Sequence, residues 1–140
     1  MQGSPDAIAR GLAVGVFSGW FPWFGFQIVI AIALAMIVRG NKIAAASATW
    51  VSNPFTYVPI FAFNYRVGYW LLGQDQQPFD INNVEQWSDV VGLGTNLLST
   101  LFFGCLVVGV FCATGTYFAG LVLVRRLRHR HQSTRRKKER

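Results

Sequence analysis

The sequence predicts an all-α integral membrane protein, built from a broken or re-entrant helical hairpin plus two to three transmembrane helices. Hydrophobic residues make up 52% of the 140 residues and charged residues 14%, whereas soluble proteins carry about 25% charged residues. The charges lie mostly outside three long apolar runs, residues 11–38, 43–72 and 90–124. Prolines and glycines interrupt the first two runs, which favours broken helices over straight spans.

Residues 11–38 are uncharged and too long for one straight span. A continuous helix of this length would measure about 42 Å, against about 30 Å for the hydrocarbon core of a bilayer. Pro22 interrupts the backbone hydrogen bonding of a helix, and Gly25 allows backbone angles that other residues avoid. The segment is therefore either one bent span or a hairpin of two half-helices, each about 16–20 Å long.

The helix before this break is expected to start at Ser4, with Ser4 as its cap and Pro5 in its first turn. Gly11, Gly15 and Gly19 are spaced four residues apart, so they share one helix face. In a membrane such a face lets another helix approach closely. The alternative is that these glycines reflect only the general frequency of glycine in transmembrane helices.

A second break is predicted inside the run 43–72, at Asn53 and Pro54, with a further proline at Pro59. Asn53 can cap a new helix in which Pro54 is the first residue. Small residues at 44–48 precede this break and suit close packing against the first element. The break lies about 15 Å along the run, near the middle of a bilayer.

The distribution of charge predicts the orientation. Nine of the thirteen basic residues lie in residues 125–140, and residues 73–89 carry four carboxylates without Lys or Arg. Since basic residues collect on the cytoplasmic side, the expected organisation is a membrane domain of residues 1–124 and a cytoplasmic tail of residues 125–140. Within that domain, residues 4–72 form the core, 73–89 an external loop and 90–124 the last span. The residues expected to set orientation or meet lipid headgroups are Arg39, Lys42, Arg125, Arg126 and Arg128.

Arg10 decides between the two forms of the first segment. If residues 11–38 crossed the membrane once, Arg10 would lie outside, whereas a hairpin returns Arg10 to the positively charged side. The charge rule therefore favours the hairpin by a single arginine.

The two breaks predict a candidate polar site at the midplane. A half-helix begins after each break, and helix N-termini expose free N–H groups with partial positive charge. Two such ends near the midplane resemble the anion sites of transporters with broken helices. The site residues would be Gln27, Ser52, Asn53 and Thr56, and the breaks that position them are Pro22, Gly25, Pro54 and Pro59. The alternative is that the amides of Gln27 and Asn53 only satisfy freed backbone groups.

The sequence contains no pattern that predicts catalysis or a cofactor. No nucleophile–base arrangement or phosphate loop is present, so we expect no enzymatic activity. Cys105 and Cys112 fit no zinc spacing and are most simply packing residues. The basic tail carries no interleaved aromatic residues, and a membrane tether is a simpler use for it than nucleic-acid binding.

Several short motifs carry a resemblance to a known family. Pro22-x2-Gly25-Phe26-Gln27 and the block Trp50-Val51-Ser52-Asn53-Pro54-x-Thr56 are the most specific. Together with Arg39-x-Asn41-Lys42 and Pro59, they resemble the bacterial membrane domain of unknown function (DUF) family twenty sixty-two, most closely over residues 4–72. The resemblance implies a small bacterial inner-membrane protein without implying an activity. Some relatives are appended to glycosyltransferases, which hints at lipid-linked sugar biology.

Two functional classes remain open at this stage. The first is a small transporter or lipid carrier for an anionic substrate, which needs a wet midplane. The second is a non-catalytic scaffold or accessory subunit of a membrane protein complex, which needs a dry one. The expected partners are the lipid bilayer and either further copies of the chain or other membrane proteins, with no nucleic acid.

Overall fold

The computed structural model of the chain describes residues 3–73 and 87–138, and every regular element within them is helical. The expectation of an all-α protein is confirmed for these residues. The elements are α1 (Pro5–Gly19), α2 (Gln27–Ile37), α3 (Lys42–Ala48), the short 3-10 helix η1 (Thr49–Val51), α4 (Tyr57–Leu71) and α5 (Trp87–Lys138).

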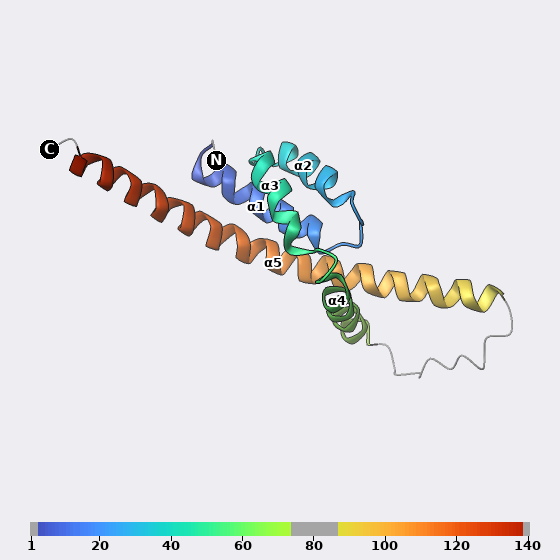
Figure 1. Cartoon of the computed structure of the whole chain (residues 1–140). Helices are drawn as coiled ribbons and strands as arrows, with labels where there is room; N and C mark the ends of the chain where they lie inside the picture. The colour runs from blue at the N-terminus through green and yellow to red at the C-terminus, as the bar shows by residue number, and fades with distance from the viewer. Residues whose placement is uncertain (1–2, 74–86, 139–140) are drawn as a thin grey trace.

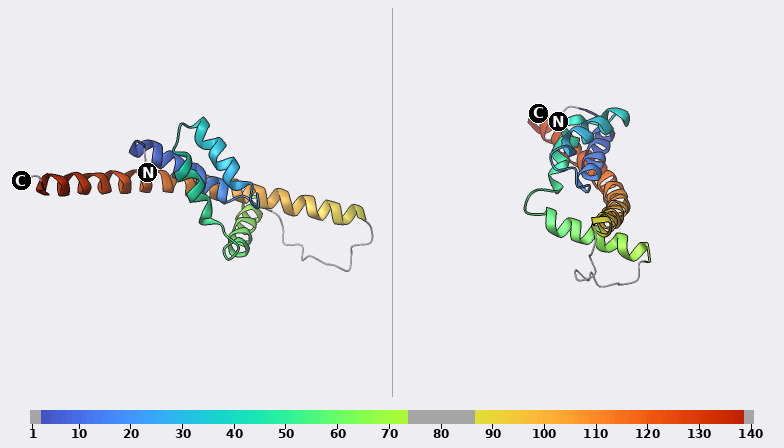
Figure 2. Two further views of the ribbon diagram at one scale, coloured as in Figure 1. Left: turned by 45° about the horizontal axis from the view of Figure 1, so that its top comes forward. Right: turned by 90° about the vertical axis from the view of Figure 1, so that its right-hand side faces the viewer.

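Helix α5 is the longest element, and α1 lies along it while α4 crosses it (Figure 1). Helix α1 runs antiparallel to it: Gly120 of α5 faces Ala9 and Leu12, and Gly109 faces Phe17 further along α1. Helices α2 and α3 pack against α1, and the views of Figures 1 and 2 place them around it. Helix α5 continues through Lys138, so the predicted tail begins as an extension of the last span.

Residues 11–38 form a hairpin, with α2 returning alongside α1. Helix α1 begins as predicted, because Ser4 Oγ accepts a hydrogen bond from the Ala7 amide and Pro5 occupies the first turn. At the far end of α2 the chain turns tightly through Arg39, whose φ is +53°. The Gly40 amide donates to the Ala35 carbonyl, and the Asn41 amide donates to the Ala7 carbonyl, each at 2.7 Å. These bonds fix the start of α3 beside the start of α1.

Glycines on α1 bring α3 into backbone contact with it. A Cβ atom at Gly11 would overlap the Asn41 carbonyl oxygen, and one at Gly15 would overlap the Ala45 carbonyl oxygen. At Gly19 it would lie 2.7 Å from Val51 in η1. The glycine face predicted from the spacing therefore lies against α3 and η1. We call α1, α2, α3 and η1 together the hairpin unit.

The chain of residues 43–72 is interrupted at the predicted break around Asn53 and Pro54, with α3 and η1 before it and α4 after it. The chain leaves helix after η1, and α4 then crosses α5 instead of continuing the line of α3 (Figure 2). The crossing depends on two glycines, because a Cβ at Gly68 would overlap the Thr100 carbonyl oxygen and one at Gly104 would overlap the Asn64 carbonyl oxygen. The predicted external loop, residues 73–89, lies almost entirely outside the described residues.

Among the described residues, many large hydrophobic side chains are exposed and several polar ones are buried, although Ile8, Phe21 and Val108 are buried as well. The largest fully buried side chains are polar or small: Asn64, Thr49, Thr100, Cys105, Ser18 and Ser52. Large hydrophobic side chains are exposed instead, including Phe55 at 93% and Trp70 and Val58 at 78% each. Soluble domains bury such residues, whereas helices in a bilayer pack through small residues and leave large apolar ones toward lipid.

Candidate functional site

The two chain breaks meet at a buried polar contact. The Ser18 hydroxyl donates to the Gln27 carbonyl oxygen at 2.8 Å, and the Ser52 hydroxyl donates to Gln27 Oε1 at 3.2 Å. Gln27 is the first residue of α2 and is 8% exposed, while Ser52 is 2% exposed. The contact therefore joins the end of α1, the start of α2 and the residue after η1.

Asn53 and Thr56 serve the second break itself. Asn53 Oδ1 accepts hydrogen bonds from the Phe55 and Thr56 amides at 3.0 and 3.2 Å, and the Tyr57 amide donates to the Asn53 carbonyl. Thr56 Oγ1 in turn accepts from the Asn53 amide at 2.8 Å. These reciprocal bonds resemble a capping box, but they close the turn over residues 53–56, whereas α4 begins at Tyr57 with Thr56 as its N-cap and no side-chain cap bond. The prediction that Asn53 caps a helix starting at Pro54 is therefore wrong. Asn53 instead closes the turn that leads into α4, and its neighbour Ser52 contacts Gln27.

The predicted breaks occupy the two loops, with one exception. Pro22 and Gly25 lie between α1 and α2, and Gly25 has a φ of +90°, which favours glycine. Pro54 lies in the turn before α4. Pro59 instead lies inside the first turn of α4, where a proline has no helical N–H bond to lose.

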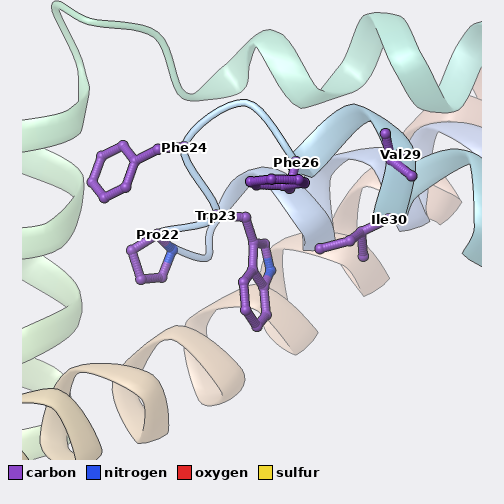
Figure 3. A pocket seen from close by; sticks show the side chains of 6 residues that line it. All are labelled: Pro22, Trp23, Phe24, Phe26, Val29 and Ile30. Carbon is purple, nitrogen blue, oxygen red and sulfur yellow. The ribbon is translucent and has the colours of Figure 1, made fainter.

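Aromatic residues cover the outer side of these loops. Phe24 packs edge-on against Tyr57 and Phe61 at the start of α4, with ring centroids 5.2 and 5.7 Å apart. Beside it lies a hydrophobic pocket of about 470 Å³ (Figure 3), lined by Pro22, Trp23, Phe24, Phe26, Val29 and Ile30. In the close-up the Phe24 ring points toward α4, away from Val29 and Ile30. The polar contact and this aromatic surface are therefore separate.

A buried amide that the sequence analysis did not single out lies where α4 crosses α5. Asn64 is fully buried, and its Nδ2 atom donates to the Trp20 carbonyl and to Cys105 Sγ, both at 3.2 Å. Its Oδ1 atom has no hydrogen-bond partner in the structure. Asn64 therefore ties α4 both to the end of α1 and to α5. Asn64 lies four residues before Gly68 and so shares its helix face, and this spacing was the signal in the sequence for a close helix contact at Asn64.

Basic residues gather at the opposite end of the hairpin unit. Arg10 Nη2 donates to the Arg39 carbonyl oxygen at 3.2 Å. Arg125 pairs with Asp6 at 3.4 Å, and Arg128 bonds the Gly3 carbonyl. Lys42 and Arg126 are exposed. The start of α1, the α2–α3 turn and the basic part of α5 therefore lie together.

One helix within the described residues is long and apolar enough to cross a membrane, Gly92–Arg130 within α5, and Gln27–Ile37 is a shorter apolar helix. A family model described as "Uncharacterized protein conserved in bacteria (DUF2062)" matches residues 1–133. The chain belongs to this family. The DUF2062 match extends well beyond residues 4–72, on which the resemblance rested most closely. No curated protein and no solved structure matches the chain.

The chemistry available to the polar contact is limited by its own hydrogen bonds. Gln27 Oε1 and the Ser52 hydroxyl are bonded to each other, and Asn53 Oδ1 is bonded to its own turn. The described residues contain no group of three or more metal-ligating side chains. The arrangement is suited to holding two chain breaks together.

Proposed function

We propose that this DUF2062 protein is a non-catalytic scaffold or accessory subunit embedded in the bacterial inner membrane. The observation that carries the proposal is the extent of exposed large hydrophobic side chains, such as Phe55, Val58 and Trp70, together with buried polar side chains such as Asn64. An apolar exterior of this extent is typical of a surface that meets lipid or other membrane proteins. The glycine contacts make the hairpin unit rigid enough to present that surface.

The proposed placement follows the charges. The basic end, with Arg10, Arg39, Lys42 and Arg125, faces the cytoplasm, as does the C-terminal tail. The hairpin unit is then re-entrant, with the tip near Pro22 inside the bilayer, and α5 crosses it. Non-helical backbone at this depth is tolerated where it is buried in protein, and the bonds among Ser18, Gln27 and Ser52 support this.

Cysteine labelling tests the placement. In a Cys105→Ser, Cys112→Ser background, we expect a membrane-impermeant thiol reagent to label Gln77→Cys from outside intact cells, and to leave Lys42→Cys and Ser133→Cys unlabelled. External labelling of Ser133→Cys would reverse the proposed orientation. External labelling of Gln2→Cys would contradict the re-entrant hairpin.

Crosslinking tests the scaffold role. Phe111 is 75% exposed on α5 and Phe21 is 9% exposed. A photoreactive phenylalanine analogue at position 111 should form a discrete protein–protein adduct in living cells, whereas the same analogue at position 21 should form none. If the analogue formed adducts only with lipid at every exposed position of α5, the result would contradict the scaffold role.

The carrier hypothesis makes the opposite prediction for Gln27. Because the Gln27 amide is paired and buried, the scaffold proposal expects Gln27→Leu to lower the melting temperature, with no change in the movement of labelled anionic lipid across proteoliposomes. A carrier would lose such movement while keeping its stability. Asn96→Leu, at an exposed amide on α5, is the matched control.

A further inference from the structure

An open groove runs between α1 and α5 on a face away from the chain breaks. Its volume is about 410 Å³, within the range of about 300–1,000 Å³ that small-ligand sites occupy. Its lining is hydrophobic along most of its length and includes one charged residue. The main lining residues are Arg10, Ala13, Val14, Ala113, Tyr117 and Phe118.

Arg10 is a cation without a compensating anion. Its Nη2 atom bonds the Arg39 carbonyl, but its Nε atom is buried and has no hydrogen-bond partner. In the described part of the chain no carboxylate pairs with it, whereas Arg125 nearby is paired with Asp6. A buried donor left unbonded is costly. Arg10 therefore brings to the groove a positive charge that no carboxylate of the described residues neutralises.

The charge lies at one particular end of the groove. Helices α1 and α5 are antiparallel, and Arg10 lies on the side of Gly120 and the basic residues that follow. Val14 and Ala113 lie further toward the middle of α5 and offer only apolar surface. A ligand with its anionic group at Arg10 could therefore lay an attached apolar chain in the groove, toward the middle of α5.

We propose that this groove binds an anionic phospholipid, with its phosphate on Arg10 and one acyl chain against Ala13, Val14 and Ala113. A guanidinium is a strong charge-assisted hydrogen-bond donor to a phosphate, and anionic lipids are concentrated at the cytoplasmic surface. A free phosphate ion would leave the apolar part of the groove unused. The inference rests on the membrane placement proposed above and assigns a ligand to a different surface from the chain breaks.

Native mass spectrometry of the purified full chain, titrated with phosphatidylglycerol or phosphatidylcholine, tests the inference. We expect one phosphatidylglycerol to be retained in preference to phosphatidylcholine. Arg10→Gln should weaken this binding about tenfold, as expected for one charge-assisted hydrogen-bonding group, and Arg10→Lys should restore part of it. Arg66→Gln removes the same charge from an exposed position on α4 that does not line the groove, and this variant should bind as the wild type does. Ala113→Phe should fill the groove and also reduce binding.

Three results would overturn the inference. The first is that Arg10→Gln binds phosphatidylglycerol as tightly as the wild type does. If Arg10→Gln does not fold, the same result for Ala113→Phe would count instead. The second is competition by glycerol phosphate as strong as that by the intact lipid, which would assign the groove to a soluble anion. The third is an altered oligomeric state of Ala113→Phe with unchanged lipid binding, which would assign the groove to a second copy of the chain.

Alkaline extraction of membranes and the crosslinking at position 111, read beside the lipid titration, separate this inference from the proposed function. A chain that resists extraction from membranes at alkaline pH and crosslinks to protein through position 111, but binds both lipids equally, would overturn only the lipid site. A chain extracted at alkaline pH would overturn the membrane placement itself. Gln27→Leu should leave phosphatidylglycerol binding unchanged, because Gln27 does not line the groove.

Discussion

The hairpin unit and the crossing of α4 over α5 are both held by close helix contacts at glycines, but the hairpin unit has more of them. In the hairpin unit, three glycines of α1 touch the backbone or side chains of α3 and η1, and two backbone hydrogen bonds close the α2–α3 turn. At the crossing, Gly68 and Gly104 form one close contact, supported by the buried Asn64. Redundant contacts allow a region to retain its structure when one is lost, so we expect α4 to separate from the rest more readily than α3.

The largest effect is expected from Gly15→Leu. The added side chain would overlap the Ala45 carbonyl and the Ala48 side chain, and small-to-large changes in packed interiors cost about 1–3 kcal/mol or more. We expect a lower melting temperature for the whole chain in detergent. Gly115→Leu is the matched control, because nothing lies within 4 Å of a Cβ at Gly115. Equal melting temperatures for both variants would mean that the close contact between α1 and α3 does not contribute to the stability of the chain.

Gly104→Leu should act more locally. Its side chain would displace the backbone of α4 at Asn64, and α4 has α5 as its main helical neighbour. Hydrogen exchange should therefore increase in α4 while the amides of α1 and α3 keep their protection. Equal loss of protection in both regions would contradict the separation drawn between the hairpin unit and the crossing.

Asn64→Leu should have an intermediate effect. It removes the hydrogen bonds to the Trp20 carbonyl and Cys105, but also removes the unpartnered Oδ1 atom. Loss of buried hydrogen bonds costs about 1–3 kcal/mol, so we expect a destabilisation near the lower end of this range. Asn96→Leu on the exposed face of α5 is the control for thermal unfolding. A stabilised Asn64→Leu would show that the orphaned oxygen outweighs both bonds.

The smallest effect is expected from Asp6→Asn. The Asp6–Arg125 pair is solvent-exposed, with side-chain exposures of 44% and 57%, and exposed ion pairs contribute about 0–1 kcal/mol. The melting temperature should change little, and any change should shrink in high salt. A large salt-independent loss would indicate that this pair holds α1 to α5, which the glycine contacts at Gly109 and Gly120 are expected to do.

The sequence was most informative where the backbone freedom or the capping chemistry of a single residue determines the local structure. Ser4 and Pro5 start α1 as predicted, and the chain leaves helix around Pro22 and Gly25 and again around Pro54, because proline and glycine limit or extend backbone freedom locally. The four-residue spacing of glycines on α1 could likewise be read directly. Each of these inferences depends on neighbouring residues alone.

The relation between distant segments was less accessible. The sequence placed Gln27, Ser52, Asn53 and Thr56 in one polar site, but only Ser52 bonds the Gln27 side chain, while the Asn53 side chain bonds the amides of its own turn. Ser52 and Asn53 are adjacent in the chain, so a difference of one residue decides which of the two side chains faces Gln27. The crosswise path of α4 was also not predicted, since it depends on the match of Gly68 with Gly104 on another helix.

The sequence separation of contacts in the hairpin unit has a consequence for the order of assembly during synthesis. Ser52 and Gln27 are 25 residues apart, whereas Arg125 and Asp6 are 119 apart, and shorter separations close with less loss of chain entropy. We expect the hairpin unit to form while the later residues are still being synthesised, and α5 to dock last. Ribosome-arrested chains that expose only residues 1–72 should therefore already form a thiol crosslink between Val14→Cys and Ala45→Cys, which replace two side chains of one packed cluster. Absence of this crosslink would mean that the hairpin unit forms only once α5 is present.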